Sequence, residues 1–213
     1  MRRNAFLILP FVSNFFVFLF LVSHLLFCAS PDTALSIKVV RKKCLQAINN
    51  IRSLEAAFYQ KTKKGEISGK VFLKRAGKSG AFGNLFLSYD APSDLEILST
   101  GRQIYMHRRL TNETSRLPIT SSPLTVLLGR SLRLGQFVQE KALRFDKERV
   151  LWTLYDPQER DRGHVTLVFS LPSFTLEGWH VFDAYGKTTQ VVLRKTVINK
   201  KFDDHFFRKK YQN

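Results

Sequence analysis

The 213-residue chain has few of the residues on which covalent cross-links depend. It contains two cysteines, and Cys28 lies in an apolar segment near the N-terminus. If that segment is removed, Cys44 has no partner and no disulfide can form within the chain. Cys44 falls on the apolar side of an expected helix, so we expect a small buried side chain there rather than a reactive thiol.

Motifs for metal binding and catalysis are missing as well. None of the five histidines stands in H-x-x-x-H or H-E-x-x-H spacing, and there is no G-x-S-x-G elbow. The carboxylates show no obvious pairing of the kind that acid–base chemistry needs. We therefore expect no metal, no cofactor and no enzymatic activity.

A phosphate-binding loop is excluded by position. Gly77-Lys78-Ser79 matches the end of the motif G-x-x-x-x-G-K-[ST]. Its first glycine would stand at position 72, which is Phe72, and no helix is expected after Ser79. The question that remains is why Arg75 lies in step with apolar residues just before this loop.

Acidic residues are scarce: 17 Asp and Glu stand against 34 Lys and Arg, for a formal net charge of +17. Such a surplus favours an anionic partner, which could be nucleic acid, a membrane surface or an acidic protein. No recognition helix or RNA-binding signature accompanies the basic residues, so we expect no nucleic-acid binding.

The first 30 residues differ from the rest. Arg2 and Arg3 precede a long apolar run, which is typical of a secretory signal peptide and less so of an uncleaved anchor. We expect a signal peptide at 1–30, cleaved between Cys28 and Ala34, and one mature domain at 35–213. Lipidation of Cys28 is disfavoured because Phe27 stands where a small residue is needed.

A helical pattern comes first in the mature chain. From Ile37 to Phe58 one stripe contains Val40, Cys44, Ala47, Ile48, Ile51, Leu54 and Phe58. This spacing predicts an amphipathic helix with Arg41, Lys42, Asn49, Asn50 and Arg52 on its outer side.

The pattern then changes to period two, which predicts strands. Ten runs are separated by turn residues: Phe58–Lys63, Ile67–Arg75, Asn84–Tyr89, Leu95–Ser99, Gln103–His107, Ser115–Pro118, Val150–Tyr155, His164–Phe169, Thr175–Phe182 and Thr188–Thr196. A series of hairpin-connected strands predicts one antiparallel sheet that curls into a barrel or half-barrel.

One segment interrupts the strands. Residues 121–129, SSPLTVLLG, combine capping serines, Pro123 in the first turn and a closing glycine, which predicts a short helix. Leu124, Leu127 and Leu128 form its apolar ridge, and a helix this short must pack against other apolar residues to form.

The side chains expected on the inner face of the sheet follow from the alternation. They are Val71, Leu73, Arg75, Leu85, Leu87, Tyr89, Ile104, Met106, Trp152, Leu154, Val165, Leu167 and Phe169. A curved sheet with helices on its concave side can be packed solid or can keep space for an apolar ligand. The residue pattern does not distinguish these two outcomes.

Several of these stretches, in this order, resemble the LolA family of lipoprotein carriers. The resemblance covers residues 37–205 and rests on these motifs: Ser68-Gly69-x-Val71-x-Leu73-Lys74-Arg75, Tyr89-Asp90-Ala91-Pro92, Ile97-x-Ser99-x-Gly101, Ser122-Pro123-Leu124-x-x-Leu127-Leu128, and 167–193, which is similar to the alphaproteobacterial branch. It implies a mainly β (α+β) fold: an incomplete antiparallel β-barrel of about ten or eleven strands, with an N-terminal helix and a short helical lid covering an apolar cavity.

The resemblance also implies a function and a site. A periplasmic, monomeric carrier in a Gram-negative bacterium would receive acylated lipoproteins from an ABC-type release complex of the inner membrane and deliver them to an outer-membrane receptor. The acyl chains would lie against the inner rows: Val71, Leu73, Leu85, Leu87, Ile104, Met106, Trp152, Leu154, Val165, Leu167 and Phe169. Arg75 would act as a latch on lid backbone carbonyls near Pro123, Leu124, Leu127 and Leu128.

Two other functions stay open. One is a sensor of similar fold that binds lipid or a protein segment and regulates an envelope-stress pathway. The other is an outer-membrane-attached lipoprotein receptor, which would need a lipidated Cys28.

Overall fold

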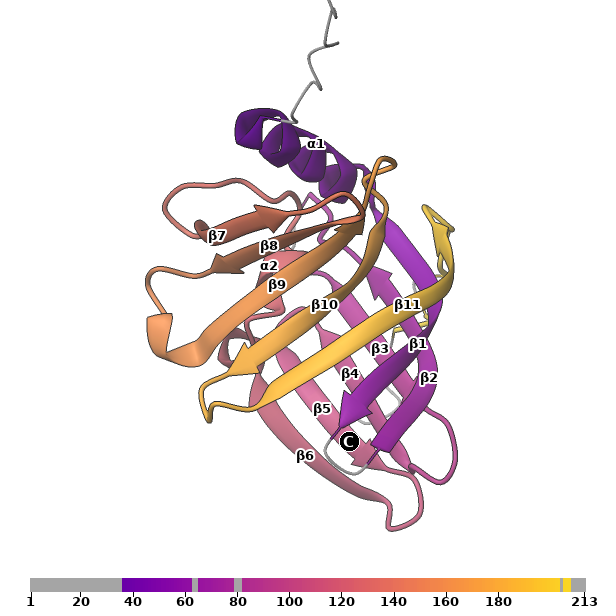
Figure 1. Cartoon of the computed structure of the whole chain (residues 1–213). Coiled ribbons are helices and arrows are strands. Elements are labelled where there is room, and N and C mark those ends of the chain that lie inside the picture. Colours follow the sequence, from indigo (N-terminus) through magenta and orange to yellow (C-terminus); the bar gives the residue numbers. More distant parts are fainter. Residues whose placement is uncertain (1–35, 63–64, 79–81, 204, 208–213) are drawn as a thin grey trace, which may run out of the picture. The chain divides into compact units, whose positions relative to one another are not determined.

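The computed structural model describes residues 36–62, 65–78, 82–203 and 205–207, and they form one antiparallel sheet with two α-helices (Figure 1). The strands are β1 Ser53–Thr62, β2 Gly65–Lys74, β3 Asn84–Tyr89, β4 Leu95–Thr100, β5 Gln103–Arg108, β6 Glu113–Pro118, β7 Gln139–Phe145, β8 Arg149–Tyr155, β9 Gly163–Ser170, β10 Leu176–Asp183 and β11 Thr188–Ile198. The helices are α1 Ile37–Asn50 and α2 Thr125–Leu128, with short 3₁₀ turns at Ile119–Ser121 and Arg160–Arg162. The expected fold class is confirmed, whereas the predicted signal peptide at 1–30 and Cys28 lie outside the described residues.

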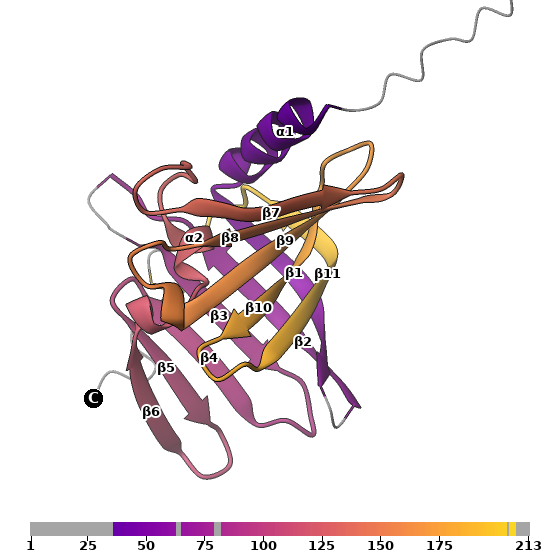
Figure 2. The same cartoon turned by 60° about the vertical axis from the view of Figure 1, so that its left-hand side comes forward.

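The strand order explains why the sheet stays open. Hairpins connect β1 through β6 and then β7 through β11, and β11 returns to pair with β1 in the middle of the sheet. The edges are therefore β6 and β7, which follow each other in the chain. Residues 119–138 join these two edges and carry α2 inside the curve of the sheet (Figures 1 and 2).

The main core lies on the inner face of the curved sheet. Buried side chains from strands on both sides of the β1–β11 pair meet there with residues of α1 and of the lid segment. Helix α1 contributes Val40, Cys44 and Ile48. Cys44 is fully buried, as expected, and burial raises its pKa to about 12, so its thiol stays protonated at neutral pH.

A second, aromatic cluster covers part of the outer face. Phe72 of β2 and Phe86 of β3 stack with ring centroids 6.1 Å apart, and Phe206 packs 4.8 Å from Phe72. Phe202 and Phe207 join them from the C-terminal segment. The residues after β11 thus fold back onto the sheet, which the sequence pattern did not indicate.

The predicted helix over Ile37–Phe58 is too long. Helix α1 ends at Asn50, Ile51 is extended, and β1 begins at Ser53. Leu54 and Phe58 are four residues apart, a spacing that fits one face of a helix and also one face of a strand. The structure uses period two here, and Leu54, Ala56 and Phe58 are all buried.

One strand, β7, was missed. Its sequence QEKALRF buries Leu143 while most of its other side chains are exposed. An edge strand with charged residues carries little apolar alternation, so its pairing with β8 could not be read from the pattern.

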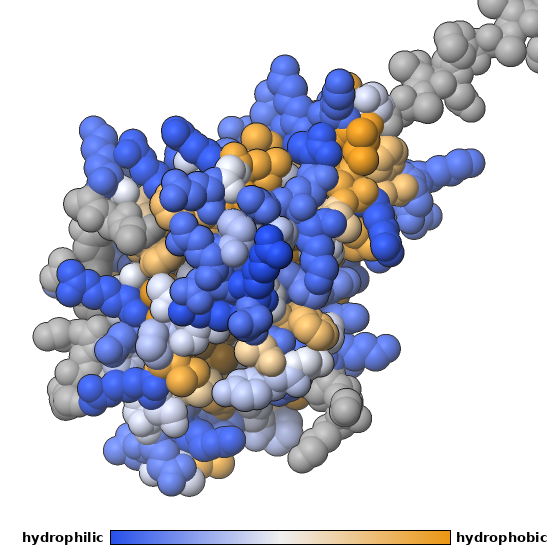
Figure 3. Space-filling view, turned by 90° about the vertical axis from the view of Figure 1, so that its left-hand side faces the viewer, coloured by the Kyte–Doolittle hydropathy of each residue, from blue (hydrophilic) through white to orange (hydrophobic). Residues whose placement is uncertain are grey.

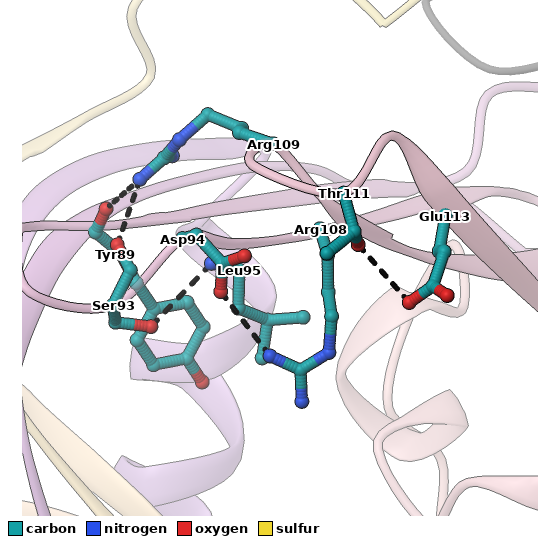
Figure 4. Close-up of polar contacts among 8 residues, drawn as sticks. All are labelled: Tyr89, Ser93, Asp94, Leu95, Arg108, Arg109, Thr111 and Glu113. Atoms are coloured by element: carbon teal, nitrogen blue, oxygen red, sulfur yellow. Dashed lines mark hydrogen bonds and ion pairs between the residues drawn. The ribbon is translucent and has the colours of Figure 1, made fainter.

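The loop between β3 and β4 is held by Arg108, the last residue of β5, and by Arg109, which follows it (Figure 4). Arg109 donates to the carbonyl oxygens of Tyr89 at 2.9 Å and Ser93 at 2.8 Å, and Arg108 pairs with Asp94 at 3.2 Å. These contacts tie the β3–β4 loop to the end of β5.

Candidate functional site

Most of the side chains predicted to line the inner face of the sheet lie together in the main core. Nine of the expected wall residues are buried in the main core: Val71, Leu73, Leu85, Leu87, Trp152, Leu154, Val165, Leu167 and Phe169. Leu127 and Leu128 of the lid belong to the same core, Pro123 is buried, and Leu124 packs against it. In this closed arrangement, lid side chains and α1 lie against the inner wall.

The β4–β5 part of the inner face is less covered. Ile104 and Met106 are half-buried, as are Leu95 and Ile97 on the neighbouring strand. On the face seen in Figure 3, apolar surface is recessed at the lower centre, and both apolar and hydrophilic residues lie around it. Apolar side chains of the inner face are therefore partly accessible even with the lid in place.

The lid helix is shorter than the predicted 121–129. Helix α2 spans Thr125–Leu128, preceded by turns in which the Ser122 hydroxyl accepts a hydrogen bond from the Leu124 amide at 3.2 Å. Val126 is buried together with Leu127 and Leu128, so the segment is apolar on more sides than the predicted ridge. The carbonyl oxygen of Leu128 accepts hydrogen bonds from the amides of Ala76 at 3.1 Å and Gly83 at 2.8 Å.

Arg75 connects the inner wall, α1 and the lid. It directly follows β2, and its side chain is 5% exposed. Its Nε donates to the Gly129 carbonyl oxygen at 2.7 Å, and one terminal nitrogen donates to the Ile48 carbonyl oxygen at 2.8 Å. Burial, and then the positive charge of Arg52, lower the pKa of Arg75 to about 10, which leaves it protonated at neutral pH.

Asn49 adds a second attachment that sequence reasoning missed. Its side-chain amide donates to the Leu132 carbonyl oxygen at 3.0 Å, and its side-chain oxygen accepts from the Leu132 amide at 2.7 Å. The helical pattern had placed Asn49 on the outer side of α1. Spacing along one helix does not reveal a partner 83 residues away.

Arg41 was also assigned to the outer side of α1 and proves to have a partner. It forms a bidentate pair with Glu140 of β7, with N–O distances of 2.7 and 2.8 Å. The indole nitrogen of Trp152 donates to the same carboxylate at 2.9 Å. Because β7 was not predicted, this contact between α1 and the edge strand could not be anticipated.

Neither a metal site nor a membrane-spanning helix is found within the described residues. Across the described ranges, no group of three or more His, Cys, Asp or Glu side chains could hold a metal ion. Within the same ranges, every helix is too short or too polar to cross a membrane.

Comparison with known families identifies the arrangement. The sequence model described as outer membrane lipoprotein carrier protein LolA matches residues 49–210, which include every strand and the lid. The chain belongs to the LolA family. This is a family of carriers rather than of enzymes, and the resemblance noted from the sequence is confirmed.

Individual relatives are distant. An outer-membrane lipoprotein carrier protein of Ralstonia nicotianae is 23% identical over 170 residues, covering 76% of this chain and 78% of that protein. A putative outer membrane lipoprotein-sorting protein domain of Vibrio parahaemolyticus is 8% identical, with a TM-score of 0.47 over 80% of this chain and 94% of that one. The complex of MucA and MucB from Pseudomonas aeruginosa gives 8% identity and a TM-score of 0.43, covering 79% of this chain and 59% of that one.

Proposed function

We propose that this LolA-family chain carries lipoproteins across the periplasm by burying their acyl chains against the inner face of its sheet. It would take them from an ABC-type release complex of the inner membrane and pass them to an outer-membrane receptor. Residues 1–30 would be the export signal and 35–213 the working domain. The observation that supports this proposal best is the contact between Arg75 and the lid.

The free energy with which Arg75 would hold the lid closed is comparable to the free energy gained by burying part of an acyl chain. A hydrogen bond to a charged group contributes about 1.5–3 kcal/mol, and Arg75 makes two short ones. Burying a methylene group contributes about 0.8 kcal/mol, so roughly eight methylene groups offset both bonds. An acyl chain can therefore displace the lid without nucleotide hydrolysis by the carrier, and its departure allows the lid to close.

The test is a release assay. Purified mature domain is added to spheroplasts that are making lipoproteins, and the soluble fraction is examined for an outer-membrane lipoprotein bound one-to-one to this chain. Leu127→Asp, which places a charge in the buried lid, should abolish release. Leu110→Asp makes the same change at a leucine that is 85% exposed and should release normally.

The variant Arg75→Leu tests the proposed latch separately from the lid itself. The Gly129 and Ile48 carbonyl oxygens lose the hydrogen bonds from the guanidinium group, so we expect a more open lid, tighter retention of acyl chains and slower transfer to the receptor. Arg194→Leu, at an exposed arginine of β11, is the matched control. Unchanged transfer by Arg75→Leu would contradict the latch, and binding of free fatty acid or a protein segment without lipoprotein release would favour a sensor.

A further inference from the structure

Two hollows beside the latch are lined by an unusual concentration of positive charge. The first, about 510 Å³, is lined by Arg52, Lys74, Arg75, Lys200 and Lys201 among others. The second, about 480 Å³, shares Arg52 and adds Arg130 and Arg133. Both volumes fall in the range of small-molecule sites. Among the described residues that line either hollow, none is acidic.

Arg75 is a second, independent feature that favours an anion in the first hollow. Its side chain is 95% buried, and its second terminal nitrogen has no hydrogen-bond partner among the described residues. A buried guanidinium nitrogen without an acceptor is costly, and the like charge of Arg52 raises that cost. Arg75 is among the residues that line the first hollow, so an oxyanion bound there would supply a compensating negative charge.

The remaining cations suit a compact oxyanion. Lys200 already pairs with Glu55, whereas Arg52 is exposed and donates to the Arg130 carbonyl oxygen at a long 3.3 Å. Arginine presents a planar fork of donors that matches the oxygens of a phosphate group. We propose that the hollow between Arg52, Arg75 and Lys201 is a phosphate-binding site, filled by a lipid headgroup or by a free phosphate.

The place of this site matters because its donors also hold the end of the lid. Arg75 bonds the Gly129 carbonyl oxygen, and Arg52 bonds that of Arg130. A bound phosphate would share both guanidinium groups with the lid. The concave shape distinguishes the site from a flat surface for an acidic protein, which would spread its contacts over a larger area.

Binding is tested on the full mature chain by calorimetric titration with inorganic phosphate and with glycerol 1-phosphate. Arg52→Gln and Lys201→Gln should each weaken binding at least about tenfold, because a charge-assisted hydrogen bond is lost. Arg194→Gln removes one charge from exposed β11 and should change affinity less than about twofold. The backbone of Arg52 accepts a hydrogen bond from the Arg75 amide and donates one to the Asn199 side chain, so the Arg52 side chain can be changed without removing these contacts.

Vesicle co-sedimentation separates the two sources. If phosphatidylglycerol vesicles bind the wild type but not Arg52→Gln, and phosphatidylcholine vesicles do not bind, the phosphate belongs to an anionic lipid. If both soluble phosphates bind with Arg52 dependence and neither vesicle does, the ligand is free phosphate. Absence of saturable binding, or equal weakening by Arg52→Gln and Arg194→Gln, would overturn the proposal, as would binding to an acidic peptide alone.

Discussion

The structural role of Glu140 follows from the side chains that contact it. Its carboxylate receives two hydrogen bonds from Arg41 and one from Trp152, so it joins α1, β7 and β8. The hydrogen bond from Arg41 is the main cause that lowers the pKa of Glu140, and the Trp152 bond acts in the same direction. Protonation of this carboxylate therefore weakens the contacts that join these three elements.

The lowered pKa of Glu140 makes the free energy of unfolding depend on pH in the acid range. Because the pKa of Glu140 is lower in the folded chain than its ordinary value of 4.5, its contribution is complete above pH 4.5 and is lost as pH falls through the folded pKa. Glu140→Gln should flatten the fall in the free energy of unfolding below pH 4.5, by about 1 kcal/mol for a partly exposed pair. Urea unfolding at several pH values measures this, with Glu113→Gln at an exposed carboxylate of β6 as the matched substitution. Identical pH profiles for wild type and Glu140→Gln would contradict it.

Residues of the site differ in how far the sequence reveals them. Val71, Leu73 and Leu85 could be predicted because strand alternation repeats at short range. Arg75 stood out as a charge in step with that row, and the family resemblance suggested its partner. Asn49 was placed wrongly because its bonds to Leu132 join segments that only the fold brings together.

At the scale of elements, the lid is held by its surroundings rather than by its own helix. Four helical residues cannot form a stable helix in water. The segment is fixed by buried side chains, by the donors of Ala76 and Gly83, and by the two bonds between Asn49 and Leu132. Its position therefore depends on α1 and on the segment after β2.

Asn49→Ala tests the contribution of α1. Both polar groups of Leu132 lose their partner, so we expect faster hydrogen exchange at the Leu132 amide and in 125–132, by about five- to tenfold for a bond of about 1 kcal/mol. Asn50→Ala changes the neighbouring, exposed asparagine and should leave exchange in the lid unaltered. If the two variants show the same exchange rates, the hydrogen bonds between Asn49 and Leu132 do not contribute to holding the lid.

Strands could be predicted where the two-residue alternation of apolar and polar side chains dominates the sequence. The inner strands β2, β3, β8 and β9 have clear alternation, whereas charged β7 does not. The boundary between α1 and β1 was misplaced because Leu54 and Phe58 satisfy both periods. Tertiary pairing with β2 and β11 decides in favour of a strand there, and no local pattern encodes that pairing.

At the scale of the whole molecule, the formal net charge of +17 should govern association with the proposed partners. Complementary charge accelerates encounter and is screened by salt. We expect transfer from the inner-membrane release complex to slow markedly when ionic strength rises from about 0.01 M to about 1 M, which shortens the Debye length from about 30 Å to about 3 Å. Transfer rates that do not respond to salt would show that the excess charge has no part in docking.

The connection between the edge strands has a mechanical consequence. Residues 119–138 join β6 to β7, so the lid is also a covalent tether across the open side of the sheet. An extended chain spans at most about 3.3–3.6 Å per residue, and the folded turns of this segment are much shorter. If the lid opens as proposed, the connection between β6 and β7 could span a longer distance, and the event that uncovers the inner wall would also allow the two halves of the sheet to move apart around bulkier cargo.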